Sequence, residues 1–189
     1  MIARVTPVFA KRGFRATTVD DLLSAGGVGV SNFYSLFDGK EDCFVAAFDR
    51  VVAGVRARIL DELEGAEDWA EGAYIALRRV LRTVLEEPLE ARLVLVEAQS
   101  AGAGPIGRYN ALLDEAVALV AGARELYPAA RELPASFEQT AVSGLVFYLQ
   151  QCLVRPAGSS LEELLAETSD LLLLPIVGET ALRRLRRAE

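Results

Sequence analysis

Apolar residues recur at helical spacing along nearly the whole chain, and no segment shows the strict alternation of a half-buried strand. One stripe runs from Phe44 to Leu63 and predicts a single long helix that ends at Gly65. Later stripes, bounded by glycines and prolines, predict helices over residues 69–84, 88–100, 106–126, 135–154 and 160–187, with a loop between Pro128 and Pro134 and a turn at residues 156–159. The pattern therefore predicts an all-α fold.

The N-terminal quarter predicts two short helices joined by a glycine turn. Thr18 and Asp21 have the spacing of a capping box, which favours a helix start at this point. Gly26-Gly27 suits the left-handed backbone that ends helices, and a second short helix is predicted from Gly29 to about Phe37. This is the layout of a helix-turn-helix, in which the second helix enters the major groove of DNA.

The helices on either side of this unit have less certain starts. Asp38 and Glu41 have capping-box spacing and are predicted to open the following long helix. Thr6 and Pro7 read as the cap and first residue of the first helix. Alternatively, that helix begins earlier, and either Pro7 distorts it or the chain is shortened at its N-terminus.

Short motifs in this quarter resemble the tetracycline-repressor-like (TetR) family of transcriptional regulators. They are FAKRGF at residues 9–14, ATTV at 16–19, GV at 27–28, FYSLF at 33–37 and KEDCF at 40–44. The resemblance implies a three-helix DNA-binding domain at residues 1–46 and a helical ligand-binding and dimerisation domain at 47–189, about nine helices in all. It also implies a homodimer that binds an inverted-repeat operator and responds to a small-molecule effector.

The candidate DNA contacts follow from the predicted second helix and from the resemblance. Asn32 can read adenine with two hydrogen bonds, and Val30 can lie against a thymine methyl group. The resemblance implies phosphate contacts by Thr18, Tyr34 and Lys40. The full predicted set is Thr18, Gly29, Val30, Ser31, Asn32, Tyr34, Ser35 and Lys40.

Some residues depart from the family pattern and weaken the expected grip on DNA. Gly29 stands where the family usually has a hydroxyl residue, and Leu36 stands where it often has His or an aromatic residue. Residues 1–50 hold six basic and six acidic side chains, so they carry no net positive charge. Since phosphate attraction dominates affinity for DNA, we expect modest binding that weakens with salt.

The last two predicted helices carry the expected dimer interface. Both are apolar nearly all round, which suits burial on more than one side. In the alternative interpretation they are ordinary core helices of a monomer. The predicted interface residues are Leu145, Tyr148, Leu149, Leu171, Leu172, Leu174 and Ile176.

Candidate ligand contacts are aromatic or polar residues on the predicted middle helices, because ligand pockets are mostly apolar with a few placed polar groups. Arg92 and Glu97 are the main polar candidates, and an anionic effector would favour Arg92. The set is Trp69, Tyr74, Arg92, Glu97, Gln99, Tyr109, Phe137, Gln139 and Tyr148.

Composition argues against several other functions. The net charge of −7 lies wholly beyond residue 50, and the chain has no histidine and only two cysteines, Cys43 and Cys152, both expected to be buried free thiols. No catalytic set, metal site or cofactor motif is therefore predicted, and the protein is not expected to be an enzyme. The absence of a membrane-length apolar run and of a signal-peptide pattern predicts a cytoplasmic protein.

Two functions remain from the sequence. The first is a ligand-responsive transcriptional regulator, expected to be a repressor. The alternative is an all-α dimeric ligand-binding or interaction protein whose helix-turn-helix has degenerated and binds DNA weakly. The neutral charge of residues 1–50 and Gly29 motivate this alternative.

Overall fold

The computed structural model describes residues 1–155 and 158–187, so the predicted turn at 156–159 lies partly outside the described residues. Over these two ranges the chain forms helices and no strand, which confirms the all-α prediction. The N-terminal helices are α1 (Ile2–Arg12), α2 (Val19–Gly26), α3 (Val30–Leu36) and α4 (Lys40–Leu63). The others are α5 (Trp69–Glu86), α6 (Pro88–Leu95), the 3-10 helix η1 (Glu97–Ser100), α7 (Ala103–Ala121), α8 (Ala123–Leu126), α9 (Pro128–Arg131), α10 (Phe137–Val154), α11 (Leu161–Leu172) and α12 (Leu174–Arg187).

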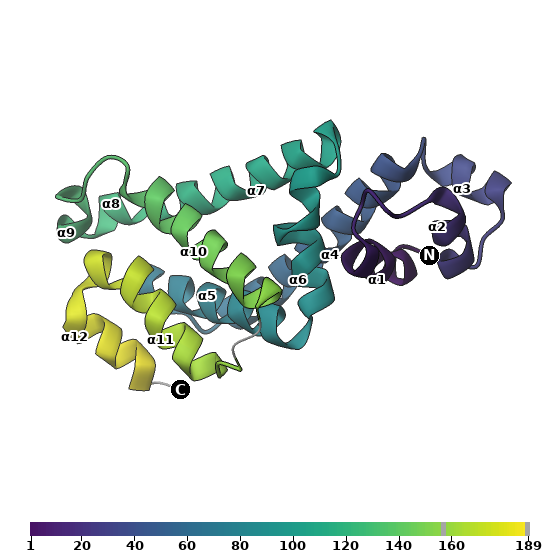
Figure 1. The fold of residues 1–189 in the computed structure, drawn as a ribbon. Coiled ribbons are helices and arrows are strands. Elements are labelled where there is room, and N and C mark those ends of the chain that lie inside the picture. The colour runs from purple at the N-terminus through teal and green to yellow at the C-terminus, as the bar shows by residue number, and fades with distance from the viewer. Residues whose placement is uncertain (156–157, 188–189) are drawn as a thin grey trace.

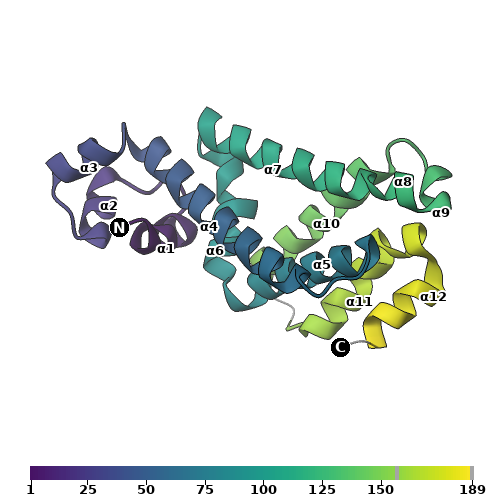
Figure 2. The ribbon, with the colours of Figure 1, turned by 180° about the vertical axis from the view of Figure 1, so that it is seen from behind.

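The molecule has a small N-terminal part at one end of a larger helical part (Figure 1). We call α1 to α3 with the first turn of α4 the reader, and α5 to α12 with the rest of α4 the helical body. The long helix α4 starts in the reader and continues into the body, as Figure 2 shows from behind. The predicted domain boundary at residues 46 and 47 therefore falls within α4.

Two apolar cores hold these parts together. The first is centred on Phe9, Leu22, Phe33 and Phe44 of the reader, and it also includes buried residues of the body, among them Leu93 of α6 and Tyr109 of α7. The second joins α5 to α10, α11 and α12. Because the first core crosses from the reader into α6 and α7, a movement of those helices is transmitted to the reader by packing.

The first helix begins before Thr6, as in the alternative interpretation of the sequence. Helix α1 begins at Ile2, so Pro7 lies inside it, and Thr6 donates its hydroxyl to the carbonyl oxygen of Ile2 at 3.1 Å. Proline has no N–H to donate to the carbonyl one turn back, so α1 lacks one internal hydrogen bond.

The predicted capping box at Asp38 and Glu41 is wrong. The N-cap of α4 is Gly39, without a side-chain cap. The backbone N–H of Asp38 donates to the carboxylate of Asp42 at 3.2 Å, and the Glu41 carboxylate instead accepts from the N–H of Gly104 at 2.8 Å.

The last predicted helix is also wrong as a single element, because it is split into α11 and α12. Its start is as predicted, since Ser160 and Glu163 form a capping box. The break follows Leu172, where Pro175 cannot donate to the carbonyl of Leu171. A kink also lies within α12 at Gly178, whose φ of 78° is not helical. The predicted helices at 88–100 and 106–126 are likewise divided into α6 with η1 and α7 with α8, and the predicted loop after Pro128 contains α9.

Both cysteines are free thiols, as predicted. Cys43 is buried in the core of the reader, and burial raises the pKa of its thiol to about 11. Cys152 on α10 is half-buried. None of the described helices is long and apolar enough to cross a membrane.

Candidate nucleic-acid interface

The helix-turn-helix is fixed by local hydrogen bonds that the sequence predicts. The backbone N–H of Asp21 donates to the hydroxyl oxygen of Thr18 at 3.2 Å, and the N–H of Thr18 donates to the Asp21 carboxylate at 2.9 Å, which confirms the capping box. The hydrogen bond from the backbone of Thr18 is the main cause that lowers the pKa of Asp21. Gly27 ends α2 with a φ of 67°, which turns the chain toward α3.

Helix α3 buries one side and leaves the rest open to solvent. Phe33 is fully buried beneath the helix, with its ring centroid 5.4 Å from that of Phe37. Beside this buried ring Val30 is 57% exposed and Tyr34 is 54% exposed, although the Tyr34 ring centroid lies 5.3 Å from that of Phe33. The remaining predicted groove residues, Ser31, Asn32 and Ser35, are exposed as well.

The N-terminus of α3 carries no side-chain cap, because the capping residue is Gly29. Its backbone is extended, and a Cβ at this position would meet no atom within 4 Å. The free N–H groups of the first turn of α3 are therefore open to an outside acceptor such as a phosphate oxygen.

Lys40 is directed into the reader. Its ammonium group donates to the carbonyl oxygens of Phe14 at 2.9 Å and Thr17 at 2.8 Å. It also lies 4.3 Å from the centroid of the Phe14 ring, close enough for a cation–π interaction. Lys40 thus ties the linker between α1 and α2 to the start of α4.

Arg92 and Glu97 lie between the helical body and the reader. The Glu97 carboxylate, 7% exposed, accepts the backbone N–H of Phe14 at 3.2 Å and pairs with Arg92 at 3.2 Å. The Arg92 Nε donates to the carbonyl oxygen of Ala10 at 2.9 Å. These two predicted ligand residues are therefore bound to the end of α1.

The other predicted ligand residues do not meet in one place. Trp69 donates its indole N–H to the carbonyl of Leu119 and packs on Tyr127, whereas Tyr148 donates to the Glu167 carboxylate. Gln99 of η1 donates to the carbonyl of Leu95 at the end of α6, and Gln139 donates to Ser143 within α10. Tyr74, Tyr109 and Phe137 pack within the apolar cores or against them.

A polar contact that the sequence analysis missed joins three helices of the body. Gln150 of α10 donates to the carbonyl oxygen of Leu95 at 2.8 Å and to the hydroxyl of Tyr109 on α7 at 3.4 Å. Burial raises the pKa of Tyr109. The only signal in the sequence is a polar pair, Gln150-Gln151, within an otherwise apolar helix.

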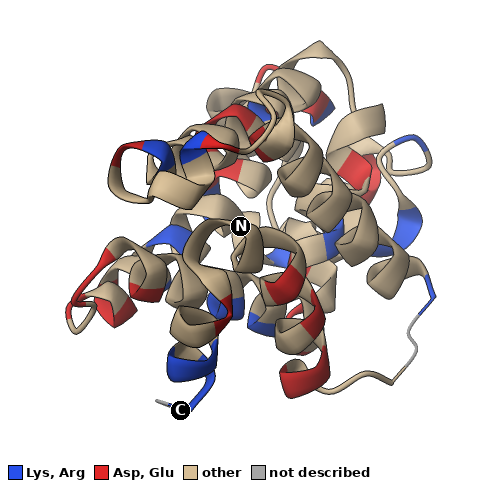
Figure 3. Cartoon of the chain, turned by 90° about the vertical axis from the view of Figure 1, so that its left-hand side faces the viewer, with Lys and Arg blue, Asp and Glu red and all other residues tan. Residues whose placement is uncertain are grey.

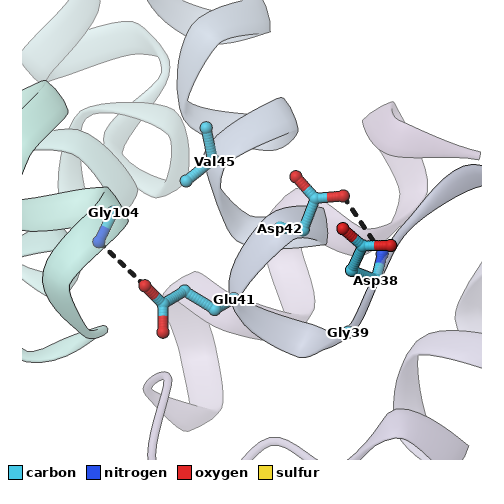
Figure 4. Close-up of a pocket in the computed structure, with 6 residues that line it drawn as sticks. All are labelled: Asp38, Gly39, Glu41, Asp42, Val45 and Gly104. Carbon is cyan, nitrogen blue, oxygen red and sulfur yellow. Dashed lines mark hydrogen bonds between the residues drawn. The ribbon is translucent and has the colours of Figure 1, made fainter.

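Two surface depressions lie beside the reader. One, of about 330 Å³, is lined by three carboxylates, as Figure 4 shows, together with two glycines and a valine. Its charge repels phosphate, so it does not suit an anionic ligand. The other, of about 510 Å³, lies between α1 and α2. None of the predicted ligand residues lines either depression.

The predicted dimer residues divide into two groups. Leu149, Leu172 and Ile176 are buried in the core of the subunit itself. Leu171 is exposed on α11, and Leu145, Tyr148 and Leu174 are half-buried. Two exposed apolar residues of α10, Phe147 and Val154, are not among the predicted interface residues.

Comparison with known proteins agrees with this geometry. Residues 6–47 match the family described as "Bacterial regulatory proteins, tetR family". An uncharacterised HTH-type transcriptional regulator, YezE of Bacillus subtilis, is 26% identical over 91 residues. That match covers 48% of this chain and 43% of YezE, so less than half of the relative's length is matched.

Solved structures share the whole fold. The fatty acid degradation regulator FadR of Bacillus halodurans superposes with a TM-score of 0.75 at 18% identity, covering 94% of this chain and 97% of that one. FadR of Bacillus subtilis in complex with stearoyl-CoA gives a TM-score of 0.72 at 15% identity with the same coverage. A TetR-family member of Streptomyces coelicolor, SCO3833, gives 0.61 at 20% identity, covering 94% of this chain and 90% of that one.

The helix-turn-helix geometry and the family match over residues 6–47 together define an N-terminal domain of the kind found in bacterial regulators that bind DNA. The predicted resemblance to the TetR family is confirmed for this N-terminal segment, residues 6–47.

Proposed function

We propose that this protein is a homodimeric repressor that binds an inverted-repeat operator and is released by a small-molecule effector. The observation that carries the proposal is the open face of α3, where Val30, Asn32 and Tyr34 are all exposed. A helix of seven residues is too short to be stable alone, and α3 is held in place by the buried Phe33. Its exposed apolar side chains can contact another molecule. The major groove of DNA accepts such a helix.

The proposed DNA contacts are the exposed residues of this face. Val30, Ser31, Asn32 and Ser35 meet the base edges, and Tyr34 meets the backbone. Thr18 is omitted because its hydroxyl already donates to the Asp21 carboxylate at 2.8 Å and accepts the Asp21 N–H. The N-terminal N–H groups beyond Gly29 bind a phosphate. Lys40 is omitted because its ammonium already holds two carbonyl groups.

The proposed effector enters the helical body. The FadR structure of Bacillus subtilis contains stearoyl-CoA, and its fold matches this chain closely, which makes an acyl-CoA the first effector to test. Entry requires a cavity that opens between helices, and the polar contact of Gln150 with α6 and α7 is a natural place for it to form.

The first experiment is selection of duplexes from a random library by the purified protein at low salt. We expect enrichment of an inverted repeat and loss of binding when Val30 and Asn32 are both changed to alanine. Stearoyl-CoA is then titrated against the complex, with coenzyme A as the control. Enrichment of single half-sites alone, or binding that the double variant retains, would contradict the proposal.

A second function is favoured by the charge of the reader. With no net positive charge over residues 1–50 and Lys40 directed inward, the chain can be a dimeric ligand-binding protein whose reader no longer binds DNA. A folded dimer that binds stearoyl-CoA but enriches no duplex at low salt would establish this alternative.

A further inference from the structure

Two glutamates cross between the reader and the helical body, and the first is Glu41. It lies in the first turn of α4, directly after the turn that follows α3. We call α3, the helix proposed to enter the major groove, the reading helix. The Glu41 carboxylate accepts the backbone N–H of Gly104 in the first turn of α7 at 2.8 Å (Figure 4). The residue before α7, Gly102, has a φ of 113°, and a Cβ there would collide with the same carboxylate. The approach therefore depends on glycine.

The second is Glu97, which makes the same kind of contact in the opposite direction. It belongs to η1 of the body and accepts the N–H of Phe14, just after α1. The preceding residue, Gly13, has a φ of 79°, and a Cβ there would lie 3.2 Å from the Glu97 carboxylate. In both places a glycine with positive φ lets a peptide N–H meet a carboxylate of the other part.

Both backbone polar groups of Phe14 are held by side chains from different parts of the molecule. Its N–H is bound by Glu97 of the body, and its carbonyl oxygen is bound by Lys40 of the reader. Arg92 pairs with Glu97 and bonds the carbonyl of Ala10 in the last turn of α1. If η1 shifts, it therefore either moves the end of α1 with it or breaks these hydrogen bonds.

We propose that Glu41 and Glu97 are positioning residues that fix the orientation of the reading helix, and that the effector lowers DNA affinity by displacing their contacts with Gly104 and Phe14. This inference rests on the proposed function. The two contacts attach the reader to the body at separate points, Glu41 at the start of α4 and Glu97 at the end of α1. Displacement of one contact alone leaves the other in place, whereas displacement of both leaves the orientation of the reader to the shared apolar core and α4.

The test uses variants that remove the acceptor, Glu41→Ala and Glu97→Met, and variants that keep a weaker one, Glu41→Gln and Glu97→Gln. The control is Glu115→Ala, which removes a carboxylate paired with Arg56 between α4 and α7 but away from the reader. Operator affinity is measured with and without stearoyl-CoA. We expect each acceptor-removing variant to reduce the effector-induced change in affinity by roughly five- to tenfold, the glutamine variants to restore part of it, and the control to match the parent chain.

Hydrogen exchange of the free protein gives a readout that needs no DNA. The amide of Gly104 is expected to exchange about tenfold faster in Glu41→Ala, and that of Phe14 in Glu97→Met. Unchanged protection of these amides overturns the positioning role, and so does faster exchange with an unchanged effector response. Failure of the parent chain to bind any duplex overturns the proposed function instead, and the amide readout then decides the positioning role by itself.

Discussion

At the scale of single residues, Lys40 stabilises the structure of the reader instead of contacting a DNA phosphate. Its ammonium holds the carbonyls of Phe14 and Thr17 and covers the Phe14 ring. Contact with a phosphate would require breaking these interactions, which are partly shielded from water. The benefit of Lys40 is therefore an ordered linker between α1 and α2 rather than an added charge at the interface.

Replacing Lys40 by methionine, which keeps the length of the side chain, tests this role. We expect the free energy of unfolding in urea to fall by about 1–2 kcal/mol, because two carbonyl groups lose their donor. The dependence of operator affinity on salt is expected to stay the same, whereas loss of one phosphate contact would reduce its slope by about 0.9. A reduced slope together with unchanged stability would instead place Lys40 on the DNA.

Glu138 provides the clearest pH dependence. It is buried at the start of α10, and a hydrogen bond from the Arg124 guanidinium lowers the pKa of its carboxyl below the usual 4.5. A depressed pKa stabilises the fold above the pKa of the unfolded chain, and that stability is lost as pH falls through the folded value. Glu138→Gln should therefore lower the melting temperature at pH 7 by roughly 3–6 °C, and the difference should shrink below about pH 4.5. Exposed Glu132→Gln is the control, and a difference that does not depend on pH would contradict the ionic role.

At the scale of helices, the reading helix α3 depends on its ends. Seven residues are too few for a helix to be stable alone, so α3 relies on Phe33 and on the turns around it. Its N-cap, Gly29, has an extended backbone that any residue adopts, whereas Gly27, two residues earlier, has a φ of 67°. The two glycines therefore differ in whether a side chain is tolerated.

The variants Gly29→Ser and Gly27→Ser test this difference. Gly29→Ser is expected to raise the free energy of unfolding by about 0.5–1 kcal/mol, because serine caps the helix and restricts the unfolded chain. It should also strengthen operator binding by supplying a hydroxyl for a phosphate. Gly27→Ser should lower stability by about 1 kcal/mol through its left-handed backbone. Equal effects of the two substitutions in thermal unfolding would contradict this account.

Elements whose cause is local were predictable from sequence, and those set by distant contacts were not. The capping boxes at Thr18 and Ser160 need only residues three apart, and both are present. Glu41 instead finds a partner 63 positions away, although its spacing from Asp38 matches a local cap. Glu97 reaches a residue 83 positions away, which left it among candidate ligand contacts instead of at the junction with the reader. The same limit applies to Leu149, whose burial in its own subunit depends on the packing of α10 against other helices.

At the scale of the whole molecule, the net negative charge is confined to the helical body. The reader is neutral, and the net charge of −7 belongs to the rest of the chain. Figure 3 shows the end that lies away from the reader, where acidic and basic residues are mixed and the arginines of α12 gather near the C-terminus. Since an acidic body does not attract DNA, the proposed operator affinity depends on two readers acting together.

The exposed apolar residues of α10 and α11 form the surface that we propose for the second subunit of the dimer. Phe147 is 61% exposed on α10, and Val154 and Leu171 are exposed on α10 and α11. These two helices lie at the front in Figure 1 and behind α5 in Figure 2, so they present one side of the body. Exposed aromatic residues of this kind contribute most of the binding energy in many interfaces.

Phe147→Asp should therefore separate the dimer. Burying an unpaired carboxylate in place of an aromatic ring is expected to weaken dimerisation at least about 100-fold, measured by sedimentation, and to weaken operator binding because each reader then binds alone. Leu119→Asp is the matched control, since Leu119 is 72% exposed near the end of α7. A Phe147→Asp protein that stays dimeric, or a Leu119→Asp protein that becomes monomeric, would move the interface to another face. If Phe147→Asp gives a folded monomer that keeps full operator affinity, the requirement for two readers is wrong and the neutral reader binds DNA well by itself.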